Sequence, residues 1–228
     1  MELLRLTRVG KKYVKGKVEV EALRGVDLSI EKGEFLAVVG PSGSGKTTLL
    51  NIIGCLDSAT SGSIRYNGKE LGEMDEKSLS IYRKENIGFV FQAYNLIPVL
   101  TVRENVELPL VIEKKHSPQA IRERVEKIIA AVGLGDKLDR LPGELSGGQE
   151  QRVSIARALV KEPLLVLADE PTANLDSKTA EEIIGLMKQI NQTIKTTFVF
   201  STHDALVQPY AARIITLKDG NIASDERR

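Results

Sequence analysis

The chain has 228 residues, of which 42% are hydrophobic and 28% charged, which suits one large globular domain or a core with a subdomain. Its 32 basic and 31 acidic side chains give a formal net charge of +1, which does not indicate nucleic-acid binding, and no apolar run approaches the roughly 20 residues of a membrane-spanning helix. The N-terminus lacks a signal-peptide pattern and Cys55 is the only cysteine, so we expect a cytoplasmic protein without an internal disulfide or cysteine-bound metal.

The first third of the chain predicts β-strands. Residues 3–9, 18–23 and 25–30 suit an antiparallel layer, and residues 35–39 form an apolar stretch of strand length. After a glycine-rich loop, residues 48–53 have the composition of a buried helix. A further strand and turn follow at 61–68, then a polar surface helix at about 74–85 and a buried strand at 87–91.

From residue 101 to about 144 the chain predicts helices. Ser117-Pro118 is a helix start, and apolar residues then recur on one helical face, at Ile121, Val125, Ile128, Ile129 and Val132. Strands at 164–168, 197–200 and 214–217 alternate with a helix that carries apolar residues between 183 and 190. We therefore predict an α/β fold with a mostly parallel sheet, an N-terminal antiparallel β layer and an inserted helical subdomain.

A glycine-rich loop at residues 40–47 is the strongest short signal in the chain. It matches the phosphate-binding pattern G-x-x-x-x-G-K-[ST] at every fixed position, and it lies between a predicted strand and a predicted helix. Glycine lets the backbone curl around a phosphate, and the N–H groups of a helix N-terminus attract its charge. We expect a nucleoside triphosphate to be held by Gly40, Pro41, Ser42, Gly43, Ser44, Gly45, Lys46, Thr47 and Thr48.

Two side chains of this loop have separate expected roles. Lys46 would reach the β- and γ-phosphates, and the Thr47 hydroxyl would bind Mg²⁺, which bridges the phosphate oxygens. The alternative is a glycine-rich strand-to-helix turn that holds a lysine by chance. The match at every fixed position, in the required context, favours a P-loop NTPase core.

Two carboxylates, Asp169 and Glu170, follow the predicted apolar strand at 164–168. The carboxyl ends of strands in an open α/β sheet are where ligands bind. Asp169 would hold Mg²⁺, and Glu170 could polarise a water for attack on the γ-phosphate. The alternative is an acidic turn in solvent.

A second phosphate-binding device is predicted at residues 145–149, Leu-Ser-Gly-Gly-Gln. Ser146 would cap the helix that follows, and two glycines lie at the N-terminus of that helix. In isolation the segment could be a plain loop. The P-loop, this segment, the strand before Asp169 and Glu170, and His203 occur in the order seen in ATP-binding cassette (ABC) ATPases, which the chain resembles over essentially its whole length.

The resemblance implies an ATPase that requires Mg²⁺, with a nucleotide-binding core at 1–92 and 159–228 and a helical subdomain at 93–158 that carries the signature segment. It also implies a homodimer on ATP binding, in which two copies meet head to tail. Each ATP would then lie between one P-loop and the second copy's Ser146, Gly147, Gly148 and Gln149.

Four more residues match motifs of the family. Gln92 resembles the Q-loop glutamine, which contacts Mg²⁺ or the attacking water. His203 resembles the switch histidine that hydrogen-bonds the γ-phosphate, while we expect His116 to lie on the surface. Asp176 lies in a segment similar to the D-loop at the dimer interface, and it could also cap a helix. Tyr13 resembles the aromatic residue that stacks on adenine; the alternative is an ordinary sheet tyrosine.

Two stretches, residues 51–57 and 91–110, resemble the lipoprotein-releasing (LolD) and macrolide-export (MacB) cassettes. This implies a separate transmembrane permease and a peripheral location on the inner face of the cell membrane. The side chains that would meet the permease, or else belong to the subdomain core, are Tyr94, Leu96, Ile97 and Leu100.

Other classes of ABC cassette carry the same ATP-binding motifs. A regulator of a permease-like partner in cell division and an amino-acid importer would use the same ATPase chemistry. A cassette of DNA repair would carry a long coiled coil between the motifs, and a translation-associated cassette would carry the motifs twice. The sequence has neither feature.

Overall fold

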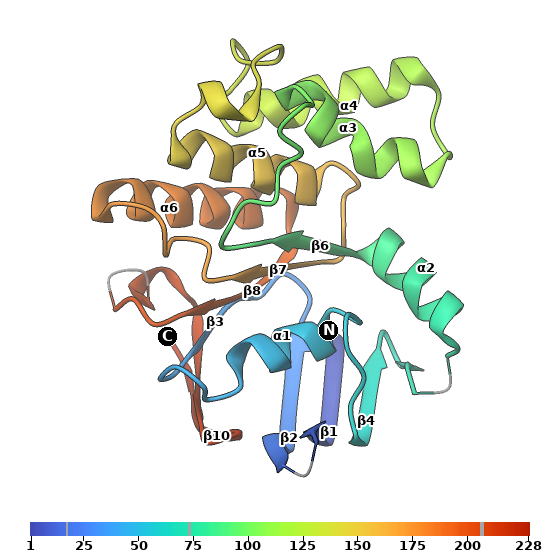
Figure 1. The fold of residues 1–228 in the computed structure, drawn as a ribbon, viewed down its shortest axis with the longest axis vertical. Coiled ribbons are helices and arrows are strands. Elements are labelled where there is room, and N and C mark those ends of the chain that lie inside the picture. The colour runs from blue at the N-terminus through green and yellow to red at the C-terminus, as the bar shows by residue number, and fades with distance from the viewer. Residues whose placement is uncertain (17, 73, 206–207) are drawn as a thin grey trace.

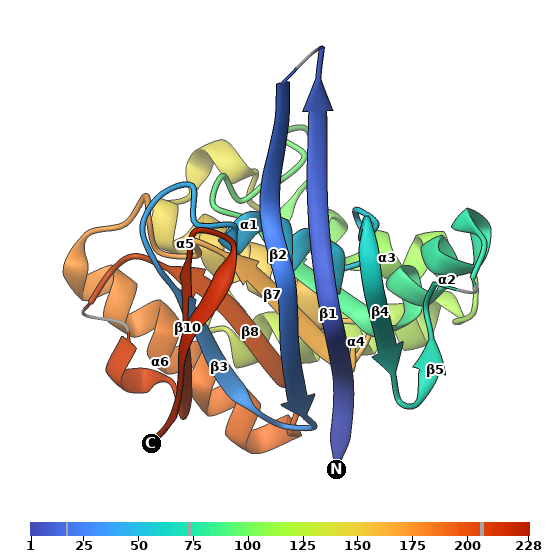
Figure 2. The ribbon, with the colours of Figure 1, turned by 90° about the horizontal axis from the view of Figure 1, so that it is seen from below.

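The computed structural model describes residues 1–16, 18–72, 74–205 and 208–228. Two β-sheets form its frame, and helix α1 (Lys46–Ile53) lies between them (Figures 1 and 2). A group of longer helices covers the opposite face of the larger sheet. The predicted α/β fold, with a parallel core sheet and an N-terminal antiparallel layer, is confirmed.

The smaller sheet is antiparallel and has the strand order β2-β1-β4-β5. Its strands are β1 (Glu2–Lys15), β2 (Val18–Glu31), β4 (Ser61–Tyr66) and β5 (Lys69–Glu70). The hairpin of β1 and β2 extends beyond the body of the molecule (Figure 2).

The prediction of two separate strands at 18–23 and 25–30 was wrong, because β2 is continuous. Gly25, with a φ of 70°, was interpreted as a break. The register instead shifts between the pairs Val9–Val26 and Lys11–Leu23, so this glycine belongs to a β-bulge that keeps the ladder intact.

The larger sheet has the order β10-β9-β3-β8-β7-β6. Its strands are β3 (Phe35–Val39), β6 (Ile87–Val90), β7 (Leu165–Asp169), β8 (Thr197–Thr202), β9 (Arg213–Lys218) and β10 (Asn221–Arg227). All neighbouring pairs are parallel except β9 with β10. The carboxyl ends of β3, β6, β7 and β8 therefore lie at one edge of the sheet.

Each of the six α-helices in the described ranges begins near a position that the sequence marks. Besides α1 they are α2 (Glu76–Asn86), α3 (Val102–Glu113), α4 (Pro118–Ala131), α5 (Gly147–Leu159) and α6 (Ser177–Ile194), and single 3₁₀ turns occupy Pro142–Glu144 and Gln208–Tyr210. Side chains of Asp75, Thr101, Ser117, Ser146 and Asp176 cap the five longer helices.

Two apolar clusters hold these layers together. One lies between the two sheets and includes Leu49 and Ile53 of α1. The other joins the opposite face of the six-stranded sheet to helices α3, α4, α5 and α6, with Val106, Ile129 and Ile155 fully buried. Among the described residues, no helix combines the length and the apolar character that crossing a bilayer requires.

Candidate active site

The loop between β3 and α1 is shaped to receive an anion. A Cβ on Gly40 would lie 2.1 Å from the carbonyl oxygen of Leu217, and Gly45 has a φ of 105°, so neither position accommodates a larger residue without strain. Ser44 is 3% exposed, and its Oγ has no hydrogen-bond partner among the described residues. The loop thus places a buried polar atom and a helix N-terminus where a phosphate could satisfy them.

Lys46 supplies the positive charge of this loop. The residue is only 8% exposed, and its Nζ donates to the carbonyl oxygens of Gly40 at 2.9 Å and Pro41 at 3.1 Å. The same nitrogen lies 4.0 Å from Oε1 of Glu170. The ammonium group is therefore held over the loop by main-chain oxygens.

Thr47 and Asp169 meet at the carboxyl edge of the larger sheet. The Thr47 hydroxyl donates to Oδ1 of Asp169 at 3.2 Å, and the Ser201 hydroxyl donates to the same oxygen at 2.6 Å. One carboxylate beside one hydroxyl fits Mg²⁺, which takes few protein oxygens and completes its shell with phosphate and water. No group of three or more His, Cys, Asp or Glu residues that could hold a metal occurs in the described ranges.

Glu170 is held in an unusual backbone conformation, with a φ of 46°. Its N–H donates to the Ser201 hydroxyl at 2.9 Å, and its Oε2 lies 2.9 Å from Nδ1 of His203, whose side chain is 67% exposed. Non-glycine residues adopt this region rarely, and such strain is concentrated at functional sites. Ser201 thus fixes both Asp169 and Glu170, a contact between β7 and β8 that local sequence did not indicate.

These residues surround an open cavity of about 570 Å³. Of the residues predicted to bind nucleotide or metal, those that line it are Ser42, Gly43, Gly45, Lys46, Thr47, Thr48, Gln92, Glu170 and His203. Val20, Glu21 and Ala22 of β2, and Ala173, line it too and were missed by sequence analysis. Only the pairing of β2 with β1 brings the first three there, so no local motif could have found them.

The predicted second phosphate-binding segment lies elsewhere. The Ser146 hydroxyl accepts from the Gln149 N–H at 3.4 Å, and the Gln149 Oε1 accepts from the Ser146 N–H at 3.0 Å, so the helix cap is confirmed. Ser146 is exposed to solvent. Gly147 and Gly148 face the Tyr94 hydroxyl and Thr179, and residues 146–149 are not among the described residues that line the cavity.

The loop after β6 is tied to helix α5. Tyr94 and Asn95 both have positive φ, at 57° and 51°, and their carbonyl oxygens accept from the Arg157 guanidinium at 2.7 and 2.6 Å. Burial lowers the pKa of Arg157. The Gln92 carbonyl accepts from the Asn174 amide at 3.0 Å. Sequence analysis missed Arg157 because its partners lie about 60 residues away.

Further predicted residues are not among the described ones that line the cavity: Gly40, Pro41, Ser44 and Asp169, which adjoin it, and Asp176 and Tyr13. Asp176 accepts from the Thr179 N–H at 3.0 Å, so its role as a helix cap is confirmed. Tyr13 is 40% exposed, and its hydroxyl donates to Asp57 at 2.7 Å. It pairs with Val20 in the hairpin, so it lies next to a residue that does line the cavity.

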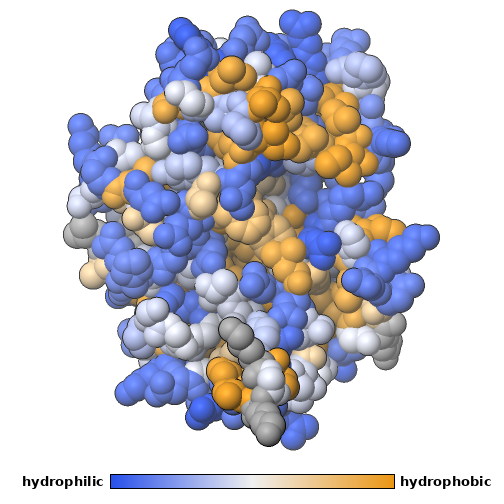
Figure 3. All heavy atoms as spheres, viewed as in Figure 1, coloured by the Kyte–Doolittle hydropathy of each residue, from blue (hydrophilic) through white to orange (hydrophobic). Residues whose placement is uncertain are grey.

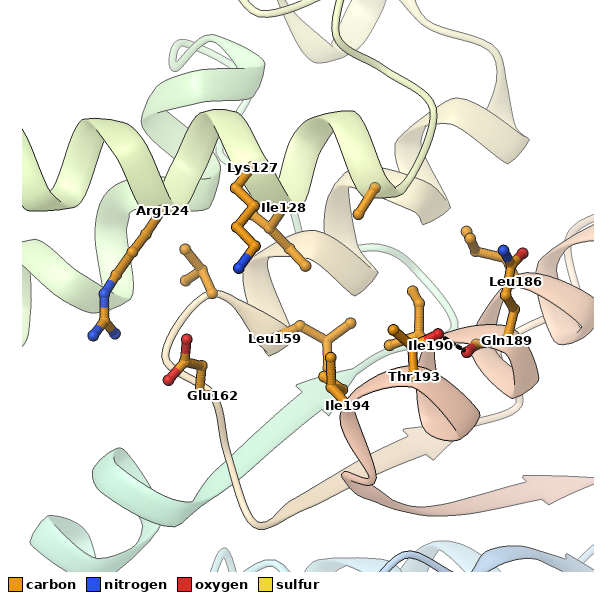
Figure 4. Close-up of a pocket in the computed structure, with 12 residues that line it drawn as sticks. Arg124, Lys127, Ile128, Leu159, Glu162, Leu186, Gln189, Ile190, Thr193 and Ile194 are labelled. Atoms are coloured by element: carbon orange, nitrogen blue, oxygen red, sulfur yellow. Dashed lines mark hydrogen bonds between the residues drawn. The ribbon is translucent and has the colours of Figure 1, made fainter.

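The lone cysteine and His116 take no part in this site. Cys55 is buried, and burial raises the pKa of its thiol to about 11. His116 is half-buried beside Glu113. A separate apolar hollow of about 330 Å³ lies between α4, the end of α5 and α6, with Arg124 and Lys127 on its α4 side (Figure 4), and shares no residue with the nucleotide-sized cavity.

The sequence has close counterparts among known proteins. A family model described as ABC transporter matches residues 23–173. The bacitracin export ATP-binding protein BceA of Halalkalibacterium halodurans is 43% identical over 222 residues, which cover 97% of this chain and 87% of that protein. The chain belongs to the ABC transporter family.

Two further matches indicate which part of an ABC transporter this chain is. The macrolide export ATP-binding/permease protein MacB of Marinobacter nauticus is 44% identical over 98% of this chain, which covers 34% of that protein. A solved structure, the post-hydrolysis dimer of the cassette MJ0796 bound to ADP and Pi, is 44% identical, with a TM-score of 0.90 and coverage of 99% of this chain and 98% of that one. The ABC chain is therefore an ATP-binding subunit and an ATPase.

Proposed function

We propose that this ABC subunit binds MgATP at the cavity around Lys46 and hydrolyses it within a homodimer, to drive a separate export-type permease. The observation that supports the ATP site most strongly is the convergence of the P-loop and Glu170 around one cavity, with Asp169 hydrogen-bonded to Thr47 of its lining. The triphosphate would accept hydrogen bonds from the loop N–H groups and from the Lys46 ammonium. In this structure that ammonium donates to the carbonyl oxygens of Gly40 and Pro41.

The metal would be held by Thr47 and Asp169, with Gln92 nearby at the cavity wall. When bound, Mg²⁺ supplies charge neutralisation at the phosphate oxygens. Glu170 would act as the general base, because its carboxylate lines the cavity and its Oε1 lies 4.0 Å from Nζ of Lys46, which would hold the phosphates. Nδ1 of His203 lies 2.9 Å from Oε2 of that carboxylate, and we propose that the ring donates an N–H to a phosphate oxygen when ATP is bound.

The complete ATP site would be composite, with residues from two copies of the chain. Ser146 with its two glycines is an exposed helix N-terminus outside the cavity, so we propose that it completes the γ-phosphate site of a second copy. Asp176, which is exposed at the end of the loop after Glu170, would lie at the same interface. The dimeric structures of MJ0796, a relative that is 44% identical, support this assembly.

ATP would close this dimer because it binds two surfaces at once. Loss of the γ-phosphate link after hydrolysis would let the halves part. We propose that residues 93–158 act as the helical subdomain that transmits this motion, against a core formed by residues 1–92 and 159–228. The Arg157 contacts with Tyr94 and Asn95 would carry it from the signature helix to the Q-loop.

The surface around α3 is the best candidate for a permease contact. Exposed apolar side chains lie there at Ile97, Val99, Val111 and Ile112, and Figure 3 shows apolar residues gathered over α3 and beside α2. Leu96 packs instead against the core, so the stretch after Gln92 contributes side chains both to the core and to the surface. The protein would then act at the cytoplasmic face of the membrane.

The names of two relatives, for bacitracin export and macrolide export, favour an exporter or a mechanical transmitter of the same type. A regulator of cell division or an amino-acid importer would use the same ATP site. The permease contact can be tested with Ile112→Asp, which should abolish recovery of the chain with membranes that contain its permease. Ile194→Asp, at a similarly exposed position on α6, is the matched control; equal recovery of both variants would contradict this docking surface.

The ATPase proposal is tested by Glu170→Gln. We expect hydrolysis to fall by roughly 100- to 10,000-fold, as for loss of a general base, while ATP binding persists. The variant with MgATP should then elute at twice the monomer mass in light scattering. Glu123→Gln, on the exposed face of α4, should hydrolyse ATP normally. A Glu170→Gln protein that stays monomeric at saturating MgATP would refute the proposal.

A further inference from the structure

A cluster of three side chains beside the nucleotide cavity is not explained by phosphate binding. Lys11 and Tyr13 are two residues apart on β1 and so lie on the same face of the strand. Both bind Asp57, in the loop after α1: the Lys11 Nζ donates to Oδ1 at 2.5 Å and the Tyr13 hydroxyl to Oδ2 at 2.7 Å. The Ser58 N–H donates to Oδ1 as well, at 2.7 Å.

The cluster of Lys11, Tyr13 and Asp57 is partly buried, and its hydrogen bonds favour the charged form of Asp57. The side chains of Lys11 and Asp57 are 11% and 27% exposed. Burial alone would raise the pKa of Asp57, but the hydrogen bonds from Lys11, Tyr13 and Ser58 outweigh it and lower that pKa. The carboxylate is thus held in its charged form, with both oxygens occupied.

The Tyr13 ring has a cation against one face and is still partly open to solvent. The Lys11 ammonium lies over it, 4.9 Å from the ring centroid, within the range of a cation–π contact. The Tyr13 residue nevertheless remains 40% exposed. A ring that is fixed at its hydroxyl and supported by a cation, yet still open to solvent, can accept a second flat group.

The position of the ring relates it to the cavity. Tyr13 pairs directly with Val20 across the hairpin, and paired residues of antiparallel strands project to the same face of a sheet. Val20 lines the cavity, next to Glu21 and Ala22. The phenol also has a hydrogen bond with Thr48 in the first turn of α1, which lowers its pKa against the larger effect of burial. The ring therefore lies beside the cavity, next to two of the residues that line it, Val20 and Thr48.

We propose that Asp57, with Lys11, is a positioning residue that fixes the Tyr13 ring as the platform for the nucleotide base. This inference rests on the proposed function, since it assumes that ATP binds at the P-loop. It assigns Asp57 no contact with the phosphates. Loss of the Asp57 carboxylate frees the phenol and its supporting ammonium, so the base loses a fixed surface while the triphosphate keeps its own.

Calorimetric titration with ATP and with inorganic triphosphate, both with Mg²⁺, separates the two parts of the ligand. Stacking on one aromatic side chain contributes roughly 1–3 kcal/mol, so Tyr13→Ala should weaken ATP binding by about tenfold. Asp57→Ala should weaken it by roughly three- to tenfold, and the double variant no more than Tyr13→Ala alone, because both act through one ring. Triphosphate affinity should stay unchanged in all three variants.

Asp27→Ala is the matched control, since Asp27 lies on the same sheet and accepts only from the Arg8 N–H, at 3.0 Å, among its described contacts. Lys11→Met, which keeps the apolar stem, should reproduce the base-specific loss even where Asp57→Ala folds poorly. Equal losses for ATP and triphosphate in Asp57→Ala, or no loss for ATP, would overturn the inference. Unchanged binding of both ligands by Lys46→Ala would instead overturn the proposed function, and this inference with it.

Discussion

The two predicted phosphate-binding segments of this chain, the P-loop and the signature segment at residues 145–149, differ in their surroundings. The P-loop is enclosed: Lys46 is 8% exposed, its ammonium bonds two loop carbonyls, and the loop forms one wall of a cavity with Glu170 and His203. The signature segment has an equally regular helix start, with a reciprocal cap between Ser146 and Gln149. It nevertheless faces solvent and borders no part of that cavity among the described residues.

The difference teaches that a good helix N-terminus does not by itself make a site. One segment has a cavity, a lysine and carboxylates around it, whereas the other offers its own N–H groups and hydroxyl, with Tyr94 and Thr179 beside its glycines. ATP on the P-loop would leave its γ-phosphate facing open space unless another surface covers it. A second copy offers such a surface in two symmetric places.

The largest effect on ATP hydrolysis should come from a substitution that prevents the signature segment from binding phosphate but keeps its helix cap. Ser146→Asp retains a good helix cap but sets a negative charge where a second copy's triphosphate would arrive. Like charges in an interface cost several kcal/mol, so we expect ATP hydrolysis to fall by about a hundredfold. ATP binding to the isolated chain should be unchanged in calorimetry.

Ser117→Asp is the matched control, because Ser117 caps α4 with the same type of bond, to the Ala120 N–H at 3.3 Å. It should hydrolyse ATP at the normal rate. If both aspartate variants lost activity equally, the effect would belong to helix capping in general, and the contrast between the two segments would fail.

A smaller effect is expected from a substitution in the P-loop, measured as the change in ATP affinity of the isolated chain. Lys46→Ala removes a buried ammonium whose hydrogen bonds to phosphate should contribute about 1.5–3 kcal/mol, so ATP affinity of the isolated chain should drop by roughly 10- to 100-fold. Lys127→Ala, on α4 beside the separate apolar hollow, should bind ATP normally. Undiminished ATP affinity in Lys46→Ala would remove the distinction between the two segments.

The enclosed half was the easier one to predict from sequence. The P-loop follows the buried strand β3, Asp169 ends β7 and Glu170 follows it, and the parallel sheet brings those strand ends to one edge. Periodicity and the Ser117 cap also predicted the start of α4, and the apolar residues predicted to lie on a helix between 183 and 190 lie within α6. These features are local, so a short stretch of sequence suffices to specify them.

The missed features depend on contacts between distant segments. Ser201 joins two strands, and Arg157 binds a loop about 60 residues away. Strand β10 was also missed, because its residues are mostly exposed and lack an apolar pattern. The turn before it, Asp219-Gly220 with both φ angles positive, was a hairpin signal that was available and was not used.

The central claim is that each active site takes one half from each of two copies. Mixing Lys46→Ala protein with Ser146→Asp protein tests it most directly, because each variant alone should be nearly inactive. In a mixed dimer one site carries both defects and the other carries neither, so the claim predicts that ATP hydrolysis reappears on mixing and depends on protein concentration. A mixture no more active than its separate components, at concentrations where the two variants form mixed dimers, would contradict it.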